Sequence, residues 1–287
     1  MELDRTNIAI RERDYLDILD LALRVIRVHA GPLALALAAG VVPMMLLNSW
    51  LLAEYAEPDY ETGFPFGYMF FALVLVTWEM PLAAAPATVY LGEALFSERP
   101  RPAKIFRDLR GSLSQLLVYQ VFLRGLLVPV VLFAPTAVSV LAFLALLGYW
   151  PYLFIWRPYL NEVILLERNP LRAAQPDAMT SRRRSKLLHA AQAGDLFARW
   201  MAAIGVGILL FLSLWGSMWF GRTMMLSELG WNDVMYTFYY QLALWTVVSY
   251  LAVVRFLSYL DLRIRREGWE VELVMRAEEA RLKGQLT

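Results

Sequence analysis

Residues 32–52 read PLALALAAGVVPMMLLNSWLL, a stretch without one charged side chain. A helix needs about 20 mainly apolar residues to cross the hydrocarbon core of a bilayer, so this stretch predicts a transmembrane helix. Further stretches meet the same criterion, and together they predict an all-α integral membrane protein with six transmembrane helices. The expected spans cover residues 32–52, 68–91, 112–133, 136–156, 200–220 and 236–257.

The third and fourth expected spans are joined by a minimal turn at Ala134-Pro135. So short a connection also suits a tight helical hairpin that does not fully reach the other side of the membrane. The sequence leaves both possibilities open.

The composition agrees with a membrane protein. Apolar residues make up 59% of the chain and charged residues 18%, against roughly 45–50% and about 25% in soluble domains. A net charge of +1 does not favour a nucleic-acid partner. The absence of cysteine excludes disulfides and thiol catalysis. The two histidines, His29 and His189, are far apart and lack further ligands at metal spacing, so we expect no metal and no cofactor.

Basic residues gather in every second connection. The stretch 53–67 contains no Lys or Arg and 221–235 contains only Arg222, whereas 92–111, 157–199 and both terminal segments are rich in them. Because Lys and Arg are retained on the cytoplasmic side, this pattern predicts a multi-pass protein of the inner (cytoplasmic) membrane with both termini in the cytosol. The expected parts are a cytosolic amphipathic helix over 1–31, a six-helix transmembrane domain over 32–257 and a cytosolic C-terminal helix over 258–287.

Residues 13–29 (RDYLDILDLALRVIRVH) have the apolar periodicity of an amphipathic helix. Leu16, Leu19, Leu23 and Ile26 form one stripe, and charged residues lie opposite to it. We expect this helix to lie along the inner leaflet before the chain turns into the first span.

Glu79 and Arg124 are the ionisable residues deep inside the expected spans. A charge at mid-bilayer costs at least about 2.5–3.5 kcal/mol on insertion scales, so such residues are usually paired or face a cavity. The two residues lie at similar depths in antiparallel spans, which makes an intramembrane Glu79–Arg124 pair plausible. The pair would serve a gate, a relay or a headgroup site, or it would fix helix register; the second reading is favoured because no further charged residue joins it.

Pro81 and Pro86 are expected to break or kink the second span, where neighbouring alanines allow helices to approach closely. Broken helices beside charges form ligand sites in some transporters. Arg255, near the inner end of the last span, is expected to snorkel to the cytosolic interface.

Sequence motifs of metalloproteases, serine hydrolases and phosphate-binding loops are missing. We therefore predict no catalytic residues and no enzymatic activity. Four acidic residues at the cytosolic edge are interpreted as solvated loop charges: Glu98, Asp108, Glu162 and Asp195.

Arg182, Arg183, Arg184 and Lys186 fall within five positions, ahead of the fifth span. The absence of interleaved aromatic residues and the nearby bilayer argue against nucleic-acid binding. We expect these side chains to hold the loop in the cytosol and to face lipid headgroups or a protein partner, with about 1 kcal/mol of attraction per basic residue near an anionic leaflet.

Three runs carry a resemblance to a known group of proteins: YLNEVILLERNPLRAA (159–174), RRRSKLLHAAQAGDLFARW (182–200) and RFLSYLDLRIRREGWEVEL (255–273). They resemble bacterial six-span membrane proteins, including the membrane domain fused to glycerophosphoryl diester phosphodiesterases and stand-alone relatives encoded near MoxR-type ATPases. The resemblance implies a multi-pass inner-membrane protein without catalytic residues of its own. The soluble phosphodiesterase domain is absent here, so that activity is not implied.

The sequence thus predicts a non-enzymatic membrane scaffold or assembly component. It would present a basic cytosolic surface to anionic membrane lipids and to other membrane or cytosolic proteins. The alternative is a small transporter or lipid-handling protein that uses the Glu79–Arg124 pair.

Overall fold

The computed structural model describes residues 14–57, 64–95, 100–156, 158–170, 179–189, 193–226 and 232–267. Every regular element in these ranges is helical, which confirms the all-α prediction. The α-helices are α1 (Tyr15–Val28), α2 (Ala30–Leu51), α3 (Phe66–Ala83), α4 (Ala85–Ala94), α5 (Pro102–Leu116), α6 (Val128–Phe133), α7 (Thr136–Trp156), α8 (Leu160–Glu162), α9 (Ser181–His189), α10 (Ala193–Leu226) and α11 (Tyr240–Glu267). Between them lie the 3-10 turn η2 (Ala53–Tyr55) and the π-helical stretches η3 (Leu117–Leu123), η4 (Val163–Glu167) and η5 (Met235–Tyr239).

Four helical stretches of the described chain are long and apolar enough to cross a membrane. They match the first, second, fifth and sixth expected spans, and they indicate a multi-pass membrane protein. Their bounds are Ala30–Leu51, Phe66–Ala94, Gly194–Met225 and Met235–Arg265.

The third expected span is not one continuous helix. Over 112–133 the chain passes from α5 through η3 and a turn into α6. Pro129 lies in the first turn of α6, a position that tolerates proline because no intrahelical N–H is needed there, whereas a continuous helix would need one. α7 starts directly after Ala134-Pro135, where the turn was expected, and its 21 residues, Thr136–Trp156, cover the fourth expected span. The described residues therefore show four candidate spans and a hairpin of α6 and α7; six spans are not shown.

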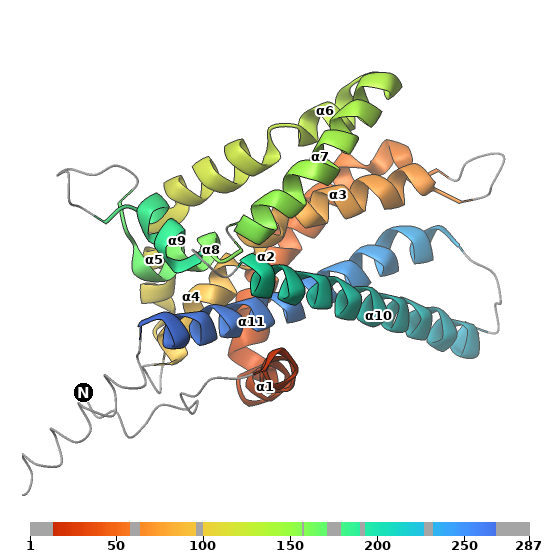
Figure 1. Ribbon diagram of the computed structural model, residues 1–287. Coiled ribbons are helices and arrows are strands. Elements are labelled where there is room, and N and C mark those ends of the chain that lie inside the picture. The colour runs from red at the N-terminus through yellow and green to blue at the C-terminus, as the bar shows by residue number, and fades with distance from the viewer. Residues whose placement is uncertain are drawn as a thin grey trace, which may run out of the picture.

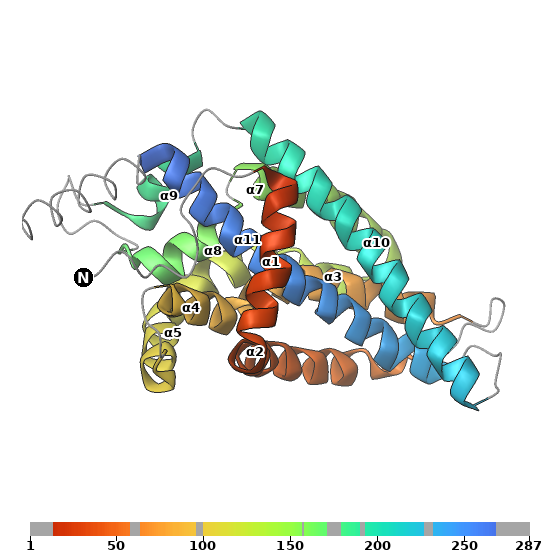
Figure 2. The ribbon, with the colours of Figure 1, turned by 90° about the horizontal axis from the view of Figure 1, so that it is seen from below.

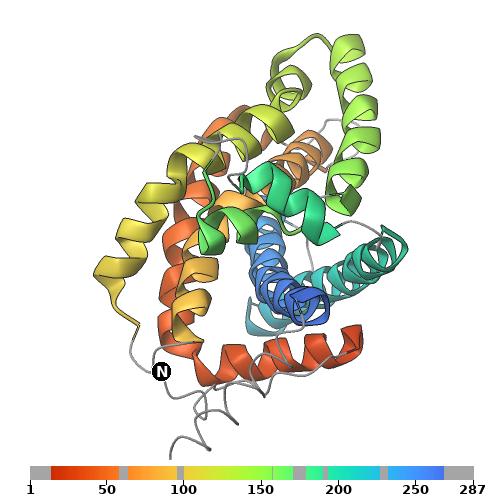
Figure 3. The same ribbon diagram turned by 60° about the vertical axis from the view of Figure 1, so that its left-hand side comes forward.

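The long helices run between two ends of the molecule (Figure 1). At one end, which we call the polar end, α5, α8 and α9 lie close to the last turns of α11; at the other, which we call the far end, α3 and α11 begin. Figure 3 views the polar end and shows the segment of α8 and α9 between α5 and α11. α11 is the central helix: it contacts α1, α3, α4 and α10, and its Trp245, Phe256 and Tyr259 are almost completely buried.

α1 crosses α11 instead of running beside it (Figure 2). Ile18, Ala22 and Val25 pack into a cluster with α4 and α11, and the Tyr250 hydroxyl of α11 donates to the Leu19 carbonyl at 3.1 Å. Leu16 and Leu23, from the expected apolar stripe, are exposed. The helix thus has a face on the protein and a second apolar face directed outward, which agrees with an interfacial position.

α2 approaches the break between α3 and α4 very closely. A Cβ atom at Gly40 would collide with the backbone carbonyl of Ala83, so the crossing requires glycine at this position. Small residues let transmembrane helices come into backbone contact, and the alanines at 83–85 complete this contact on the other side.

Candidate functional site

Glu79 lies on α3 and faces α2. Its side chain is buried, and its Oε2 accepts a hydrogen bond from Asn48 Nδ2 at 2.9 Å. Asn48 is itself fully buried. This contact connects the first two spans by a polar bond inside the apolar region, where it replaces the hydration that the carboxylate loses.

Arg124 contacts the same helix at Thr77, two residues before Glu79. Its Nη2 donates to the backbone carbonyl of Thr77 at 3.2 Å. Pro81 has no N–H to bond this carbonyl from the following turn, so the guanidinium supplies the missing donor. Among the contacts of the described residues there is no Glu79–Arg124 ion pair. The expected pair is therefore not formed: each residue binds α3 to a different neighbour.

The prolines act at the expected place. α3 ends at Ala83, and α4 begins at Ala85 with Pro86 in its first turn. Asn161 Nδ2 donates to the Pro81 carbonyl at 3.1 Å, so a side chain from the polar end binds the backbone next to the break. Two side chains from distant segments, Arg124 and Asn161, thus bond the carbonyls of Thr77 and Pro81, which are four residues apart on α3.

In the irregular third segment, two tryptophan indoles donate hydrogen bonds to backbone carbonyls. Trp78 Nε1 donates to the Gln120 carbonyl and Trp150 Nε1 to the Arg124 carbonyl, at 3.1 and 3.2 Å. Inside a bilayer the backbone groups freed by a π-helix need partners from the protein. Gly125 allows the Trp78 ring to lie against the chain, because a Cβ there would collide with it.

A group of buried charges lies at the polar end, around residues 159–169, which we call the hub segment. It contains α8 and η4 and carries Glu162 and Glu167. In a π-helix the backbone bonds join residues five apart, which brings positions i and i+5 towards one face. The π-helical turn therefore directs both carboxylates towards α11.

α11 meets these carboxylates with residues spaced four apart, which lie on one helix face. Arg255 Nε donates to Glu162 Oε1 at 2.6 Å. The Tyr259 hydroxyl donates to Glu167 Oε1 at 2.8 Å, and Arg263 Nε lies 3.9 Å from the same oxygen. Glu162 is completely buried, so the pair with Arg255 is its charge compensation.

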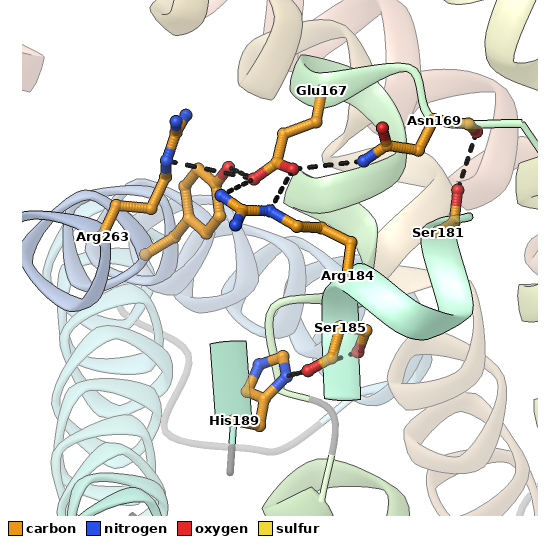
Figure 4. Close-up of polar contacts among 8 residues, drawn as sticks. Glu167, Asn169, Ser181, Arg184, Ser185, His189 and Arg263 are labelled. Carbon is orange, nitrogen blue, oxygen red and sulfur yellow. Dashed lines mark hydrogen bonds and ion pairs between the residues drawn. The ribbon is translucent and has the colours of Figure 1, made fainter. Parts of the chain in front are cut away.

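α9 is bound to the same acid (Figure 4). Arg184 donates twice to Glu167, from Nε to Oε2 at 2.5 Å and from Nη2 to Oε1 at 3.1 Å. Asn169 Nδ2 also donates to Oε2, at 3.2 Å. A two-bond contact between a guanidinium and a carboxylate fixes both distance and orientation. Glu167 thus joins the hub segment, α9 and α11 in one contact.

Both ends of α9 have further bonds to the hub segment. At the start, the Ser181 hydroxyl donates to the Asn169 carbonyl at 2.8 Å and Gln115 of α5 donates to the same carbonyl at 2.9 Å. At the end, His189 Nε2 accepts from the Tyr159 N–H at 3.4 Å, so Nδ1 carries the proton and donates to the Ser185 carbonyl at 2.6 Å (Figure 4). Burial raises the pKa of the Tyr159 phenol above its ordinary value.

Arg168 completes the network towards α5. Its φ of 53° is left-handed and ends η4. Its Nη2 lies 2.5 Å from Asp108 Oδ2 on α5, and the Asp108 side chain is buried. A left-handed residue other than glycine is uncommon and is held by its surroundings, and this ion pair provides such a restraint.

Several expectations differ from these positions. Asp108 and Glu162 are buried and paired, not solvated, because guanidinium groups from other elements reach them. Arg255 does not snorkel, because Glu162 holds it inside. Asp195 is half exposed beside Arg199, as expected of a surface charge. Glu98 and the expected C-terminal helix beyond residue 267 lie outside the described residues, as does the N-terminal part before residue 14.

Of the four basic residues at 182–186, Arg184 points inward and Arg182, Arg183 and Lys186 are exposed. Sequence reasoning missed Glu167, Tyr259 and Arg263 as members of a site. The spacing of four along α11 was visible as a helical stripe. The matching spacing of five in the hub segment becomes meaningful only when that segment is known to be π-helical.

This arrangement joins the hub segment to α9 and α11. Both hub carboxylates accept hydrogen bonds from guanidinium groups of other helices. The described part of the chain contains no group of three His, Asp or Glu residues placed to hold a metal ion.

Comparison with known proteins gives no relative. No family model matches the sequence, and neither the curated proteins nor the solved structures contain a match. The resemblance of the three runs to bacterial six-span proteins therefore stays a prediction. Those runs contribute the hub segment, α9 and the inner part of α11, which form one network here.

Proposed function

We propose that this protein is a non-enzymatic scaffold of the inner membrane. In this proposal the polar end faces the cytosol, both termini lie on that side, and α9 presents a basic surface to anionic lipid and to partner proteins. The distribution of Lys and Arg in the sequence supports this orientation. The exposed apolar face of α1 at the same end supports contact with a leaflet.

One observation carries the proposal: α9 has an inner and an outer set of basic residues. Arg184 is bonded to Glu167, while Arg182, Arg183 and Lys186 are exposed on a helix that is bound to the core at both ends. The core thus holds a short helix in place with these three cationic side chains exposed, and among the described residues no ion pair binds them. Such a rigid cationic surface suits electrostatic recognition of phosphate headgroups or acidic protein segments.

The test is charge reversal on α9 with a matched reversal on α5. The α9 variant carries Arg182→Glu, Arg183→Glu and Lys186→Glu. The control carries Arg101→Glu, just before α5, with Arg107→Glu and Arg110→Glu; these three residues are also exposed, and the net charge changes equally. We expect the α9 variant to lose most of its co-purifying anionic lipid in native mass spectrometry and its cross-links in native membranes, and the control to keep them. Equal losses, or none in the α9 variant, would contradict the proposal.

We further propose that the hairpin of α6 and α7 crosses the bilayer, which gives six spans. The Tyr55 hydroxyl, after the first span, donates to the Leu132 carbonyl at 3.4 Å, so the hairpin turn lies beside the connection at the far end. The test uses the absence of cysteine in the chain. A single Ala134→Cys variant should react with an impermeant thiol reagent from outside the cell, and reaction only from the cytosolic side would reject six spans.

The transporter alternative was built on the Glu79–Arg124 pair. Because Glu79 binds Asn48 and Arg124 binds the Thr77 carbonyl, both contacts are of the kind that fixes helix register. Replacing Glu79 by Gln keeps the bond to Asn48, and we expect this variant to retain the lipid and partner contacts of the scaffold.

A further inference from the structure

Arg184 and Arg255 each donate from Nε to a carboxylate of the hub segment, but the two contacts differ in one bond. Arg184 uses Nε and Nη2 to reach both oxygens of Glu167. Arg255 uses Nε alone, at 2.6 Å from Glu162 Oε1. Its Nη2 and the second oxygen of Glu162 are the two atoms that would form the second bond, and that direct bond is not made.

These two atoms are buried and have no hydrogen-bond partner within the described protein. Glu162 is completely buried, so its free Oε2 has no access to bulk water. The adjacent residue Asn161 is in the same condition: its Nδ2 binds the Pro81 carbonyl, and its buried Oδ1 has no partner. Three orphaned polar atoms, a donor and two acceptors, therefore come from the pair and the neighbouring residue.

Leaving a buried donor or acceptor unsatisfied costs about 1–3 kcal/mol, and more when the group is charged. The bond geometry explains why the pair does not close on itself. Asn161 is bonded to the break in the second span, and Glu162 follows it directly in α8, so the carboxylate position is restrained from one side. Arg255 is restrained because α11, the helix that carries it, is buried in the centre of the molecule. The positive charge of Arg124, which comes from the third segment, also repels the Arg255 guanidinium.

We propose that an ordered water molecule is bound inside the hub, between Arg255 Nη2 and Glu162 Oε2. The water accepts a hydrogen bond from the guanidinium and donates one to the carboxylate. It therefore satisfies both atoms and replaces the missing direct bond by a water-mediated one. Its remaining hydrogen is available to a further acceptor such as Asn161 Oδ1, which gives the two to four partners that buried waters have. A carboxylic or phosphate anion fits less well, because both orphaned oxygens are acceptors.

This site gives the hub two kinds of contact. Direct bonds fix α9 at Glu167, and a water-mediated bond joins α11 to the segment that binds the helix break. The inference does not depend on the scaffold function, because it concerns how the buried charges are satisfied.

The test is an experimental structure of the full chain in lipid nanodiscs at a resolution that shows ordered water. We expect a density peak at about 2.7–3.2 Å from both Arg255 Nη2 and Glu162 Oε2. The Arg184–Glu167 contact is the internal control, where two direct bonds leave no place for a bridging peak. A second direct bond between Arg255 and Glu162, an empty contact, or density larger than one water would each overturn the proposal.

A double variant provides a second measurement. Glu162→Met together with Arg255→Met removes both partners while keeping similar side-chain volume, and the peak should disappear. A peak that persists in this variant would mean that these two residues do not bind the water, and it would overturn the assignment.

Discussion

The hub segment and α10 differ in which side chains they bury and which they expose. Around the hub, the side chains of Glu162, Asp108 and Arg184 are withdrawn from the surface, and each forms an ion pair with a residue of another helical element. Along α10, only 6% of the apolar window is buried, and leucines, isoleucines and methionines face outward. In a soluble protein this distribution would be inverted. The comparison indicates a lipid environment along α10, whereas polar pairing joins the helices at the polar end.

Removing a hub charge tests the first side of this comparison and should have the largest effect. Glu162→Ala leaves Arg255 buried without its carboxylate, and breaking a buried pair in this way costs about 3–5 kcal/mol. Unfolding of the purified chain, followed by fluorescence of its 10 tryptophans, measures the loss. Asp195→Ala is the control, because that carboxylate is half exposed and its pair with Arg199 should contribute less than about 1 kcal/mol. Similar losses in both variants would show that burial does not distinguish the two pairs.

A methyl group added between the spans tests packing in each region. Gly40→Ala forces α2 away from the Ala83 carbonyl, and overpacking of this kind costs about 1–3 kcal/mol. Gly216→Ala on α10 is the matched control, since a Cβ there meets nothing within 4 Å. The same unfolding measurement should show a loss for the first variant and none for the second. A loss at Gly216 would mean that this side of α10 is packed against something other than lipid.

Glu167→Gln should loosen α9 more than it unfolds the protein. The amide keeps an oxygen for Tyr259 but loses the charge that binds Arg184, and hydrogen bonds to charged groups contribute about 1.5–3 kcal/mol. We expect trypsin to cleave at the basic residues of α9 several-fold faster than in the parent chain. Glu93→Gln, at the partly exposed pair with Lys104, should leave this rate unchanged. Unchanged cleavage in the first variant would mean that Glu167 does not hold α9.

The smallest effect is expected on the outer side of α10. Leu209→Ala removes a side chain that is 70% exposed, and we expect a change within about 0.5 kcal/mol. Leu146→Ala on α7, where the leucine is buried in the central core, should cost about 2–5 kcal/mol. A large effect at Leu209 would reveal a protein contact on α10.

The apolar pattern predicted the long helices because length and hydropathy alone determine whether a segment can cross a bilayer. It also located the break at Pro81 and Pro86, which follows from the missing N–H of proline. The irregular third segment was harder to foresee, because η3 is stabilised by Trp78 and Trp150, which are distant in sequence.

The site was predicted less well than the helices. The Glu79–Arg124 pair rested on equal depth, but depth does not fix the direction in which a side chain leaves its helix. Asn48 and the Thr77 carbonyl turned out to be the nearer partners. The basic run was predicted to face lipid or a partner, and Arg182, Arg183 and Lys186 are exposed. Arg184 turns inward to Glu167, whose position is set by a π-helical turn that hydropathy does not reveal.

The bonds between the hub segment and α11 join residues that are far apart in sequence, so they can form only late in the synthesis of the chain. Glu162 precedes Arg255 by 93 residues and Glu167 precedes Tyr259 by 92. At about 5–20 residues per second of translation, the ribosome needs roughly 5 to 20 seconds to synthesise that interval. The acids therefore leave the ribosome long before their partners, and α9 gains its full anchorage only after the last helix has been made. The contacts between the hub segment and α11 therefore form late in biogenesis. In a nascent chain stalled before α11 is made, we expect trypsin to cleave α9 readily.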